Sequence, residues 1–452
     1  MVKDYTLNEI TIQVIQYLKD AKRTEFNRLL DELHPYDIAR IYELLPIKHR
    51  NRFLSFLNIA QLASMLQELD NEQQQNVLNH LGIEKAVKVM DKMDNDDLVT
   101  LLEELLPESK EKFLANMKKE ESQVVQDLMN YSPETAGRLM TNRYVWIPQH
   151  YTVKDVMNKL REYAEIAESI NYLYVINDKK QLIGVISYRD LILSEPKEQV
   201  ETIMYERVIS VTVDTDQERA AQIIQRYDFL ALPVVNHDNV LVGILTVDDM
   251  IDVLIQEASE DIEKLSASGK DIDFDTKAPI AAYRRLPWLI LLLFIGLVSG
   301  TIVSTFEETL QKVVALAFFM PMIAGMTGNT GTQSLAVVVR GLTSRDINKK
   351  VVMKLIFREL LVGIIIGLTC GILISIIAYI WQGNPLLGLV IGSTLVITLI
   401  IGTLAGTIIP LILHQFKVDP AVASGPLITT LNDVLSLLIY FGIASIFISH
   451  LM

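Results

Sequence analysis

The feature that most constrains this chain is a stretch without one charged residue, which runs from Leu360 to Phe416. A membrane-spanning helix needs about 20 consecutive, mostly apolar residues, so this stretch is far too long for a single span. Inside it lies Gln382-Gly-Asn-Pro385, a tetrapeptide typical of a turn. A wholly soluble protein is therefore excluded, and we expect two spans to be joined at this turn.

Other apolar stretches complete the C-terminal half of the chain. Leu286–Phe306 and Val313–Val339 carry no charge, and a last stretch from Pro420 carries only Asp433. Residues 281–452 therefore predict an α-helical membrane domain with five spans, at about 286–306, 313–339, 358–381, 386–413 and 422–448.

Basic residues predict how these spans are oriented, because Lys and Arg are enriched in cytoplasmic connections. Arg284 and Arg285 precede the first span, and Lys417 with His414 lies between the fourth and fifth. The first twenty residues lack the basic start and apolar core of a cleaved signal peptide. We expect a multi-pass protein of the plasma membrane with cytoplasmic N-terminal domains and an extracellular C-terminus. The connection between the second and third spans holds the largest basic group: Arg340, Arg345, Lys349, Lys350, Lys354 and Arg358.

The acidic residues are concentrated in the N-terminal half. The chain has 41 Lys and Arg against 55 Asp and Glu, of which only 8 and 6 lie in residues 286–452. The first 285 residues thus carry a large negative charge, which repels nucleic acid and suits cations. The single cysteine, Cys370, excludes an intrachain disulfide.

Two copies of one pattern follow each other in the soluble half. Residues 174–192 match residues 233–251 at a constant offset of 59, and both predict strand, turn, strand and a helix capped by Ser187 or Thr246. Such a pair is similar to tandem CBS domains, α/β modules that we expect at 138–200 and 201–258.

Short helical units recur before this pair. DIARIYELLP, QLASMLQELD and KAVKVMDKMD begin 24 residues apart, and DLVTLLEELL follows after 12. Repetition at this period predicts an all-α helical solenoid over residues 1–137, in which stacked neighbours bury each other's apolar faces.

An acidic segment connects the CBS pair to the membrane domain, and we expect it to form a helix within residues 248–280. Residues 248–265 contain seven acids and one Lys, and Glu257, Glu260 and Asp261 fall on one helical face. A solvated connecting helix is one interpretation. The other is a divalent-cation sensor, since Mg²⁺ takes oxygen ligands and often only one or two carboxylates.

The last predicted span carries a carboxylate, Asp433, in the sequence PLITTLNDVLSLLIYF. A carboxylate at membrane depth costs at least about 2.5–3.5 kcal/mol, and such residues usually mark a pathway. Helical spacing places it in a small and polar stripe, and the second span contains the glycine-rich segment GMTGNTGTQS, which predicts broken or closely packed helix. The stripe consists of Gly425, Thr429, Asn432, Asp433, Ser436 and Tyr440.

The CBS repeats contain a spacing that suits a ribose. Ser187 and Asp190 stand three residues apart, as do Thr246 and Asp249, although this is also an ordinary helix start. Arg189 could assist with phosphate in the first copy, so we expect one nucleotide per pair, on the side of the first repeat.

These segments together resemble the MgtE family of magnesium channels over essentially the whole chain, most specifically in GNTGTQS and PLITTLNDVLSLLIYF. The resemblance implies a homodimer in the lipid bilayer whose spans enclose one Mg²⁺ path, closed by cytosolic Mg²⁺. It implies pore roles for Asp433, Asn329, Thr330, Gly425, Thr429 and Ser436. It also implies regulatory Mg²⁺ ligands at Asp216, Asp228, Asp249, Asp252, Glu257, Glu260 and Asp261, and ATP near Ser187, Arg189, Asp190 and Phe229.

Two other function classes stay open at this point. A secondary transporter coupled to H⁺ or Na⁺ also suits glycine-broken spans, but coupling calls for a second titratable group in the membrane, and Asp433 is the only acid we expect deep in a span. A nucleotide-sensing receptor that moves no ion has no need of Asp433. An enzyme is not expected, because no nucleophile with a base, metal set or phosphate loop is present.

Overall fold

The structure is a computed structural model that describes residues 7–163, 167–268, 272, 276–344 and 348–448. The chain divides into two compact units, residues 1–255 and 256–452. Arg345 of the predicted basic connection and part of the predicted 248–280 helix lie outside the described residues.

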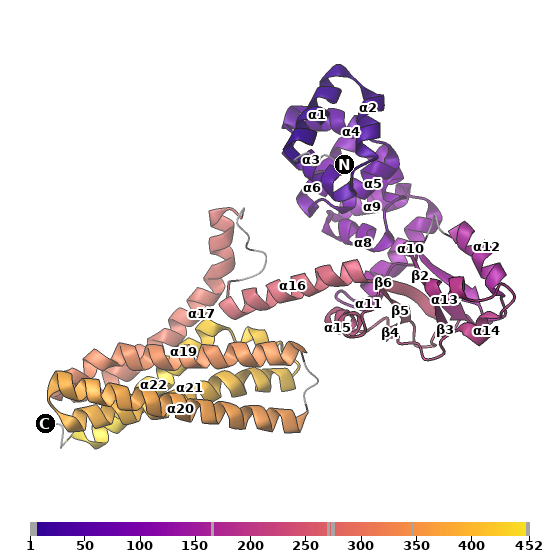
Figure 1. The fold of residues 1–452 in the computed structure, drawn as a ribbon. Helices are drawn as coiled ribbons and strands as arrows, with labels where there is room; N and C mark the ends of the chain where they lie inside the picture. Colours follow the sequence, from indigo (N-terminus) through magenta and orange to yellow (C-terminus); the bar gives the residue numbers. More distant parts are fainter. Residues whose placement is uncertain (1–6, 164–166, 269–271, 273–275, 345–347, 449–452) are drawn as a thin grey trace. The chain divides into compact units, whose positions relative to one another are not determined.

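The first unit begins with short helices placed at regular intervals (Figure 1). From Arg23 onward, nine helices begin at steps of 12 residues, which explains the 24-residue period as a two-helix repeat. Alternate helices contact each other, α3 with α5 and α5 with α7, and α4 with α6 and α6 with α8, as a solenoid requires. The helices are α1 (Leu7–Asp20), α2 (Arg23–Leu30), α3 (Pro35–Leu44), α4 (Ile47–Phe56), α5 (Ile59–Gln67), α6 (Asn71–Leu81), α7 (Ile83–Met90), α8 (Asn95–Glu104), α9 (Pro107–Asn116) and α10 (Lys119–Met129).

Two small α/β modules follow, each with a three-stranded sheet. In the first, β1 (Tyr144–Pro148) pairs parallel to β2 (Ser169–Ile176), which pairs antiparallel to β3 (Leu182–Ser187). In the second, β4 (Val211–Thr212), β5 (Ala231–Val235) and β6 (Leu241–Thr246) repeat that topology. The modules also contain α11 (Ala136–Leu139), α12 (Val153–Tyr163), α13 (Tyr188–Leu193), α14 (Val200–Ile203) and α15 (Gln217–Tyr227).

The predicted strand, turn, strand and helix is confirmed in both modules. Ser187 caps α13, because its Oγ accepts a hydrogen bond of 3.1 Å from the backbone N–H of Asp190. After β6 comes the long helix α16 (Val247–Ser266). The two sheets share one apolar cluster, in which Tyr174 and Leu182 of the first module meet Val235 and Ile244 of the second.

The second unit is a bundle of long apolar helices. They are α17 (Ala278–Thr305), α19 (Ala315–Ser344), α20 (Lys349–Gln382), α21 (Pro385–Gln415) and α22 (Gly425–Ile446), with a short α18 (Glu307–Lys312) and the 3₁₀ turn η1 (Pro420–Val422) between them. The expected turn at 382–385 is present, since Gly383 takes a left-handed φ of 70° and Asn384 caps α21.

Four helices in the described part of the chain are long and apolar enough to cross a membrane, namely α17, α20, α21 and α22. The predicted second span corresponds to α19, which has 30 residues but includes the polar segment 325–334. Those polar side chains lower its hydropathy, so the five-span count stays a prediction. α19 nevertheless packs inside the bundle, against α21 and α22.

The glycine-rich segment belongs to an unbroken helix, so of the two expected structures the closely packed one is present. A Cβ atom built on Gly331 would lie 2.1 Å from Asn432 Nδ2, and one built on Gly406 would lie 2.1 Å from the carbonyl oxygen of Gly331. Glycine lets α19, α21 and α22 approach this closely, since any side chain would collide.

Candidate functional site

Asp433 lies in the middle of α22, a helix that begins with Ser424 as its N-cap. One carboxylate oxygen, Oδ1, is buried and has no hydrogen-bond partner among the described residues. A buried carboxylate oxygen without a partner is unstable unless a cation or water reaches it. This atom is the strongest sign of an ion site in the membrane helices.

Three other polar residues of the predicted stripe form hydrogen bonds within the bundle, although Asn432 Oδ1 is also buried without a partner among the described residues. Asn432 is fully buried, and its Nδ2 donates to the carbonyl oxygen of Thr327 on α19 at 3.4 Å. Ser436 Oγ donates to the backbone carbonyl of Asp433 at 3.0 Å, and the Tyr440 hydroxyl donates to Leu316 O at 2.9 Å. Thr429 and Gly425 are half-buried near Asp433 along the helix.

The two predicted pore residues of α19 lie in different surroundings. Asn329 is exposed, and its backbone carbonyl accepts a hydrogen bond of 2.9 Å from Thr332 Oγ1. Thr330 is buried, and its hydroxyl donates to Met326 O of its own helix. Of this pair, only Asn329 has a side chain available to an ion path.

A second candidate site is formed by three carboxylates in the first unit. Oxygen atoms of Asp96, Glu168 and Asp249 all lie within 4.8 Å of one another. Asp96 is in the first turn of α8, Glu168 directly precedes β2, and Asp249 is in the first turn of α16. Solenoid, first module and second module thus each supply one ligand atom of the kind that Mg²⁺ prefers.

The electrostatics of this cluster favour a bound cation. Burial is the main cause that raises the pKa of Asp249 to about 7. It also raises the pKa of Glu168 to about 8, because the Glu168 carboxylate lies in the cluster although the residue as a whole is exposed. Burial and then Asp249 raise the pKa of Asp96. Hydrogen bonds from Thr246 and Thr141 act in the opposite direction on Asp249 and Glu168. Carboxylates that hold protons near neutral pH are ready to exchange them for a divalent cation.

Only one residue of the predicted regulatory set belongs to this cluster. Asp249 does, whereas Asp252, one turn later on α16, is exposed. Asp216 is an exposed N-cap of α15, accepting from Arg219 N at 3.2 Å, and Asp228 is exposed at the left-handed end of the same helix. The structure does not bring Asp216 or Asp228 to the three-carboxylate cluster.

The remaining predicted acids, Glu257, Glu260 and Asp261, belong to the second unit. Lys264 Nζ lies 3.1 Å from Glu260 Oε1 and 2.5 Å from Asp419 Oδ2. Burial raises the pKa of Asp261, Asp419 raises it further, and Lys264 partly offsets the rise. Lys264, the one lysine of α16, therefore acts as the counter-ion of Glu260, Asp261 and Asp419.

The predicted nucleotide site lies along a surface cavity of about 580 Å³. Ser187 and Arg189 line it together with Tyr172, whose ring lies 6.5 Å from that of Phe229. Asp190 Oδ2 accepts a hydrogen bond of 2.6 Å from Ser187 Oγ, so these two side chains already satisfy each other at the helix start. Arg189 can therefore bind a phosphate, and the rings of Tyr172 and Phe229 can contact a base.

Sequence reasoning missed several residues that the fold places at these sites. Asp96 and Glu168 were absent from the expected ligands, because no spacing links α8, β2 and α16. Glu359 was missed as a buried acid of α20, with 5% of its surface exposed. Its carboxylate accepts from Arg358 at 2.7 Å and from Ser334 Oγ on α19 at 2.9 Å. Glu359 lies at the start of the predicted 358–381 span, where a charge in the sequence looks like the boundary of an apolar stretch, so its burial against α19 was not expected.

Three family models match the chain. The model of a divalent cation transporter family matches residues 320–443, that of the MgtE intracellular N domain matches 33–134, and that of the CBS domain matches 136–195 and 200–256. The first range covers most of α19 and the helices α20 to α22, the second covers the solenoid from α3 onward, and the third covers the two α/β modules.

Relatives named as magnesium transporters are similar over long stretches. The magnesium transporter MgtE of Bacillus subtilis is 62% identical over 451 residues, which is 100% of both chains. That of Thermus thermophilus is 42% identical over 71% of each chain. Among solved structures, the soluble part of a magnesium transporter matches with a TM-score of 0.54 and 38% identity, covering 56% of this chain and 99% of the other. The cytosolic domain of the Mg²⁺ channel MgtE in complex with ATP matches with a TM-score of 0.51 and 34% identity, covering 54% and 99%.

Proposed function

The chain belongs to the MgtE family of magnesium transporters, and we propose that it is a Mg²⁺ channel that imports the ion across the plasma membrane down its electrochemical gradient. The observation that carries this proposal is the buried carboxylate oxygen of Asp433 in α22, which has no hydrogen-bond partner among the residues that the structure describes. A homodimer would bring two such carboxylates to one path, which suits an ion of charge two.

The proposed chemistry at Asp433 is a site for a largely hydrated ion. Mg²⁺ gives up its water reluctantly, so a carboxylate that binds through water costs less than a full set of protein ligands. Such a site also releases the ion readily, as conduction requires. Asn329, Thr429 and the backbone near Gly425 supply the neutral oxygen atoms that we expect along the path.

In this proposal α19 is the second of five spans despite its polar segment, because polar residues in a membrane helix are tolerated where they face protein or water. The solenoid and the CBS modules then lie in the cytosol and the C-terminus lies outside. The cytosolic origin of the solved relative that matches the first unit supports this orientation.

Gating by cytosolic Mg²⁺ is proposed at the cluster of Asp96, Glu168 and Asp249. A cation there offsets the repulsion between carboxylates and fixes the first turn of α16 against α8. Because α16 continues as one helix to Ser266 in the second unit, a change at its start can reach the membrane helices. ATP at the groove beside Arg189 and Phe229 is proposed as a modulator, supported by the relative solved with ATP.

A secondary transporter is the second candidate, and Glu359 is the observation that favours it. This residue is a second buried carboxylate in a membrane helix, which proton coupling calls for. Its hydrogen bonds from Arg358 and Ser334 favour a structural role instead, since they join both carboxylate oxygens to neighbouring side chains.

The experiment that separates the two candidates is Mg²⁺ flux into liposomes that contain the purified full-length protein and an internal Mg²⁺ dye. A channel gives uptake driven by the Mg²⁺ gradient alone, at equal pH and equal Na⁺ on both sides. Uptake that requires a H⁺ or Na⁺ gradient, and that Glu359→Gln abolishes, would establish the transporter and reject the channel.

A further inference from the structure

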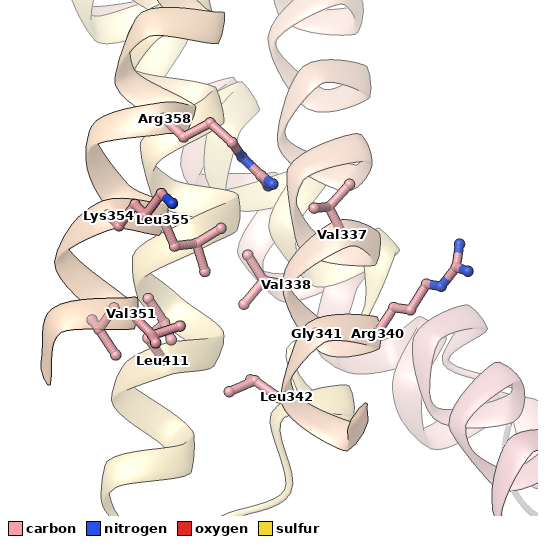
Figure 2. A pocket seen from close by; sticks show the side chains of 11 residues that line it. Val337, Val338, Arg340, Gly341, Leu342, Val351, Lys354, Leu355, Arg358 and Leu411 are labelled. Atoms are coloured by element: carbon pink, nitrogen blue, oxygen red, sulfur yellow. The ribbon is translucent and has the colours of Figure 1, made fainter. Parts of the chain in front are cut away.

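A cavity of about 600 Å³ lies where α19 ends and α20 begins (Figure 2). Val338 and Leu342 of α19 form one wall, Val351 and Leu355 of α20 form the other, and Leu411 of α21 contributes between them. Its walls are therefore apolar, as a hydrocarbon chain requires. Neither the proposed ion path nor the carboxylate cluster uses it.

The rim of this cavity is basic. Figure 2 shows Arg358 extending from α20 toward α19, with Lys354 one turn earlier, while Arg340 extends outward from α19. Glu359 is the acid that faces this group. Its Oε1 accepts from Arg358 Nε at 3.1 Å and from Nη2 at 2.7 Å. No partner for Nη1 is found in the part of the chain that the structure describes, so that end of the guanidinium can still bind an anion.

An occupant must therefore combine a negative headgroup with an apolar chain. Inorganic phosphate would satisfy Arg358 and Lys354 but would leave the valine and leucine walls in water. A zwitterionic lipid would fill the walls but bring its own cation to a basic rim. Basic pockets between membrane helices on the cytoplasmic side suit anionic lipid headgroups, and the cytoplasmic leaflet is rich in anionic lipid.

We propose that this cavity binds one anionic phospholipid of the cytoplasmic leaflet, with its phosphate on Arg358 and Lys354 and an acyl chain between α19 and α20. The proposal rests on the cytoplasmic placement of the α19–α20 connection given under the proposed function. A bound lipid joins two helices that Ser334 and Glu359 already link at 2.9 Å. It therefore acts on α19, the helix that packs against Asn432 beside Asp433.

The chain offers two variants with separate effects and one matched control. Gly341→Leu fills the cavity without touching its charges, because a Cβ atom on Gly341 meets no heavy atom within 4 Å. Lys354→Gln removes a rim charge. Lys350→Gln removes the same charge from the same helix outside the cavity lining. Arg358 is left intact, because its loss would leave Glu359 buried without its cation.

The measurement is native mass spectrometry of the full-length protein released from nanodiscs that contain equal amounts of phosphatidylglycerol and phosphatidylcholine. Wild type and Lys350→Gln should each retain one phosphatidylglycerol per chain. Lys354→Gln should retain about fivefold less, which corresponds to roughly 1 kcal/mol for one basic residue near a membrane surface. Gly341→Leu should retain none.

Equal retention of the two lipids by wild type, or undiminished retention by Gly341→Leu, would overturn the proposal. Displacement of the lipid by millimolar inorganic phosphate would show a phosphate site instead. A second copy of the chain is the other possible occupant of the cavity. It would be shown by dimers that are released without lipid and in which the cysteine of a Gly341→Cys variant is protected from thiol modification. Lipid counts need no ion flux, so a failed transport assay leaves this result interpretable.

Discussion

Lys264 Nζ lies 2.5 Å from Asp419 Oδ2, and this contact joins the end of the acidic helix α16 to the residue that caps η1 just before α22. The same ammonium group lies 3.1 Å from Glu260. Since α22 carries Asp433, this ion pair connects α16, the proposed sensor helix, to the residues directly before α22, the proposed pore helix. The Lys264 ammonium group therefore supplies the positive charge at a place where Glu260 and Asp419 come together.

The first prediction follows from that contact. Lys264→Gln leaves Glu260, Asp261 and Asp419 together without their ammonium group. Since the pair is partly exposed, we expect a loss of at most about 1 kcal/mol of stability without Mg²⁺. The melting temperature should then rise more with added Mg²⁺ than that of wild type, because the ion replaces the lost charge. The control is Lys417→Gln, which removes an exposed lysine from the connection between α21 and η1 that also holds Asp419. An unchanged Mg²⁺ response would show that these acids do not act together.

The second prediction concerns pH. Burial raises the pKa of Asp249 to about 7 and that of Glu168 to about 8, whereas in the unfolded chain both ionise near pH 4. The unfolded state therefore loses protons first, so the Mg²⁺-free protein should lose stability as pH rises from about 4 to 8. Mg²⁺ binds the ionised form, so its stabilising effect should grow over pH 6 to 8. Thermal unfolding with and without Mg²⁺ tests this, and a Mg²⁺ effect independent of pH would contradict it.

The third prediction separates two neighbouring acids of α16. Asp249→Asn removes a ligand atom from the three-carboxylate cluster, whereas Asp252→Asn removes an exposed charge one turn away. We expect Asp249→Asn to raise the Mg²⁺ concentration that closes the pore by at least about tenfold, as loss of even an outer partner can do at a metal site. Asp252→Asn should shift it much less. Patch recording across millimolar cytosolic Mg²⁺ measures both, and equal shifts would mean that only the net charge of the helix matters.

The fourth prediction tests the close packing of the membrane helices. Gly406→Ala places a methyl group 2.1 Å from the carbonyl oxygen of Gly331, and a backbone atom cannot move aside cheaply. We expect a destabilisation of about 1–3 kcal/mol, the usual cost of overpacking. Gly300→Ala on α17 is the matched control, since its Cβ meets no atom within 4 Å. The readout is thermal unfolding in detergent, and equal stability of the two variants would contradict the packing.

Local patterns were enough to predict the solenoid, the paired modules and the apolar helices. The 24-residue spacing of helical units and the 59-residue offset between Gly184 and Gly243 each report one repeated structure. These features depend on residues near each other in the chain. The position of Asp433 was also predicted, because a lone carboxylate in an apolar helix is conspicuous in any sequence.

The carboxylate cluster could not be predicted, because its members come from three elements that only the fold brings together. Asp96 sits in the first turn of a helix, where acids are common, and Asp249 was assigned from the resemblance alone. Asp216 and Asp228 are exposed and do not belong to this cluster, so their predicted role as Mg²⁺ ligands stays a prediction. Glu359 was overlooked because its partner Ser334 lies 25 residues away on another helix.

The most direct test of the account is Mg²⁺ uptake by Asp433→Asn in liposomes, under a Mg²⁺ gradient and with no other gradient. Asparagine keeps the size of the side chain and removes the charge, and an unchanged elution volume in size-exclusion chromatography checks the fold. Uptake by Asp433→Asn should fall to the level of protein-free liposomes, while Thr430→Val, a neighbouring polar-to-apolar change, should keep the wild-type rate. Wild-type Mg²⁺ uptake by Asp433→Asn would contradict the central claim that this carboxylate forms the ion path.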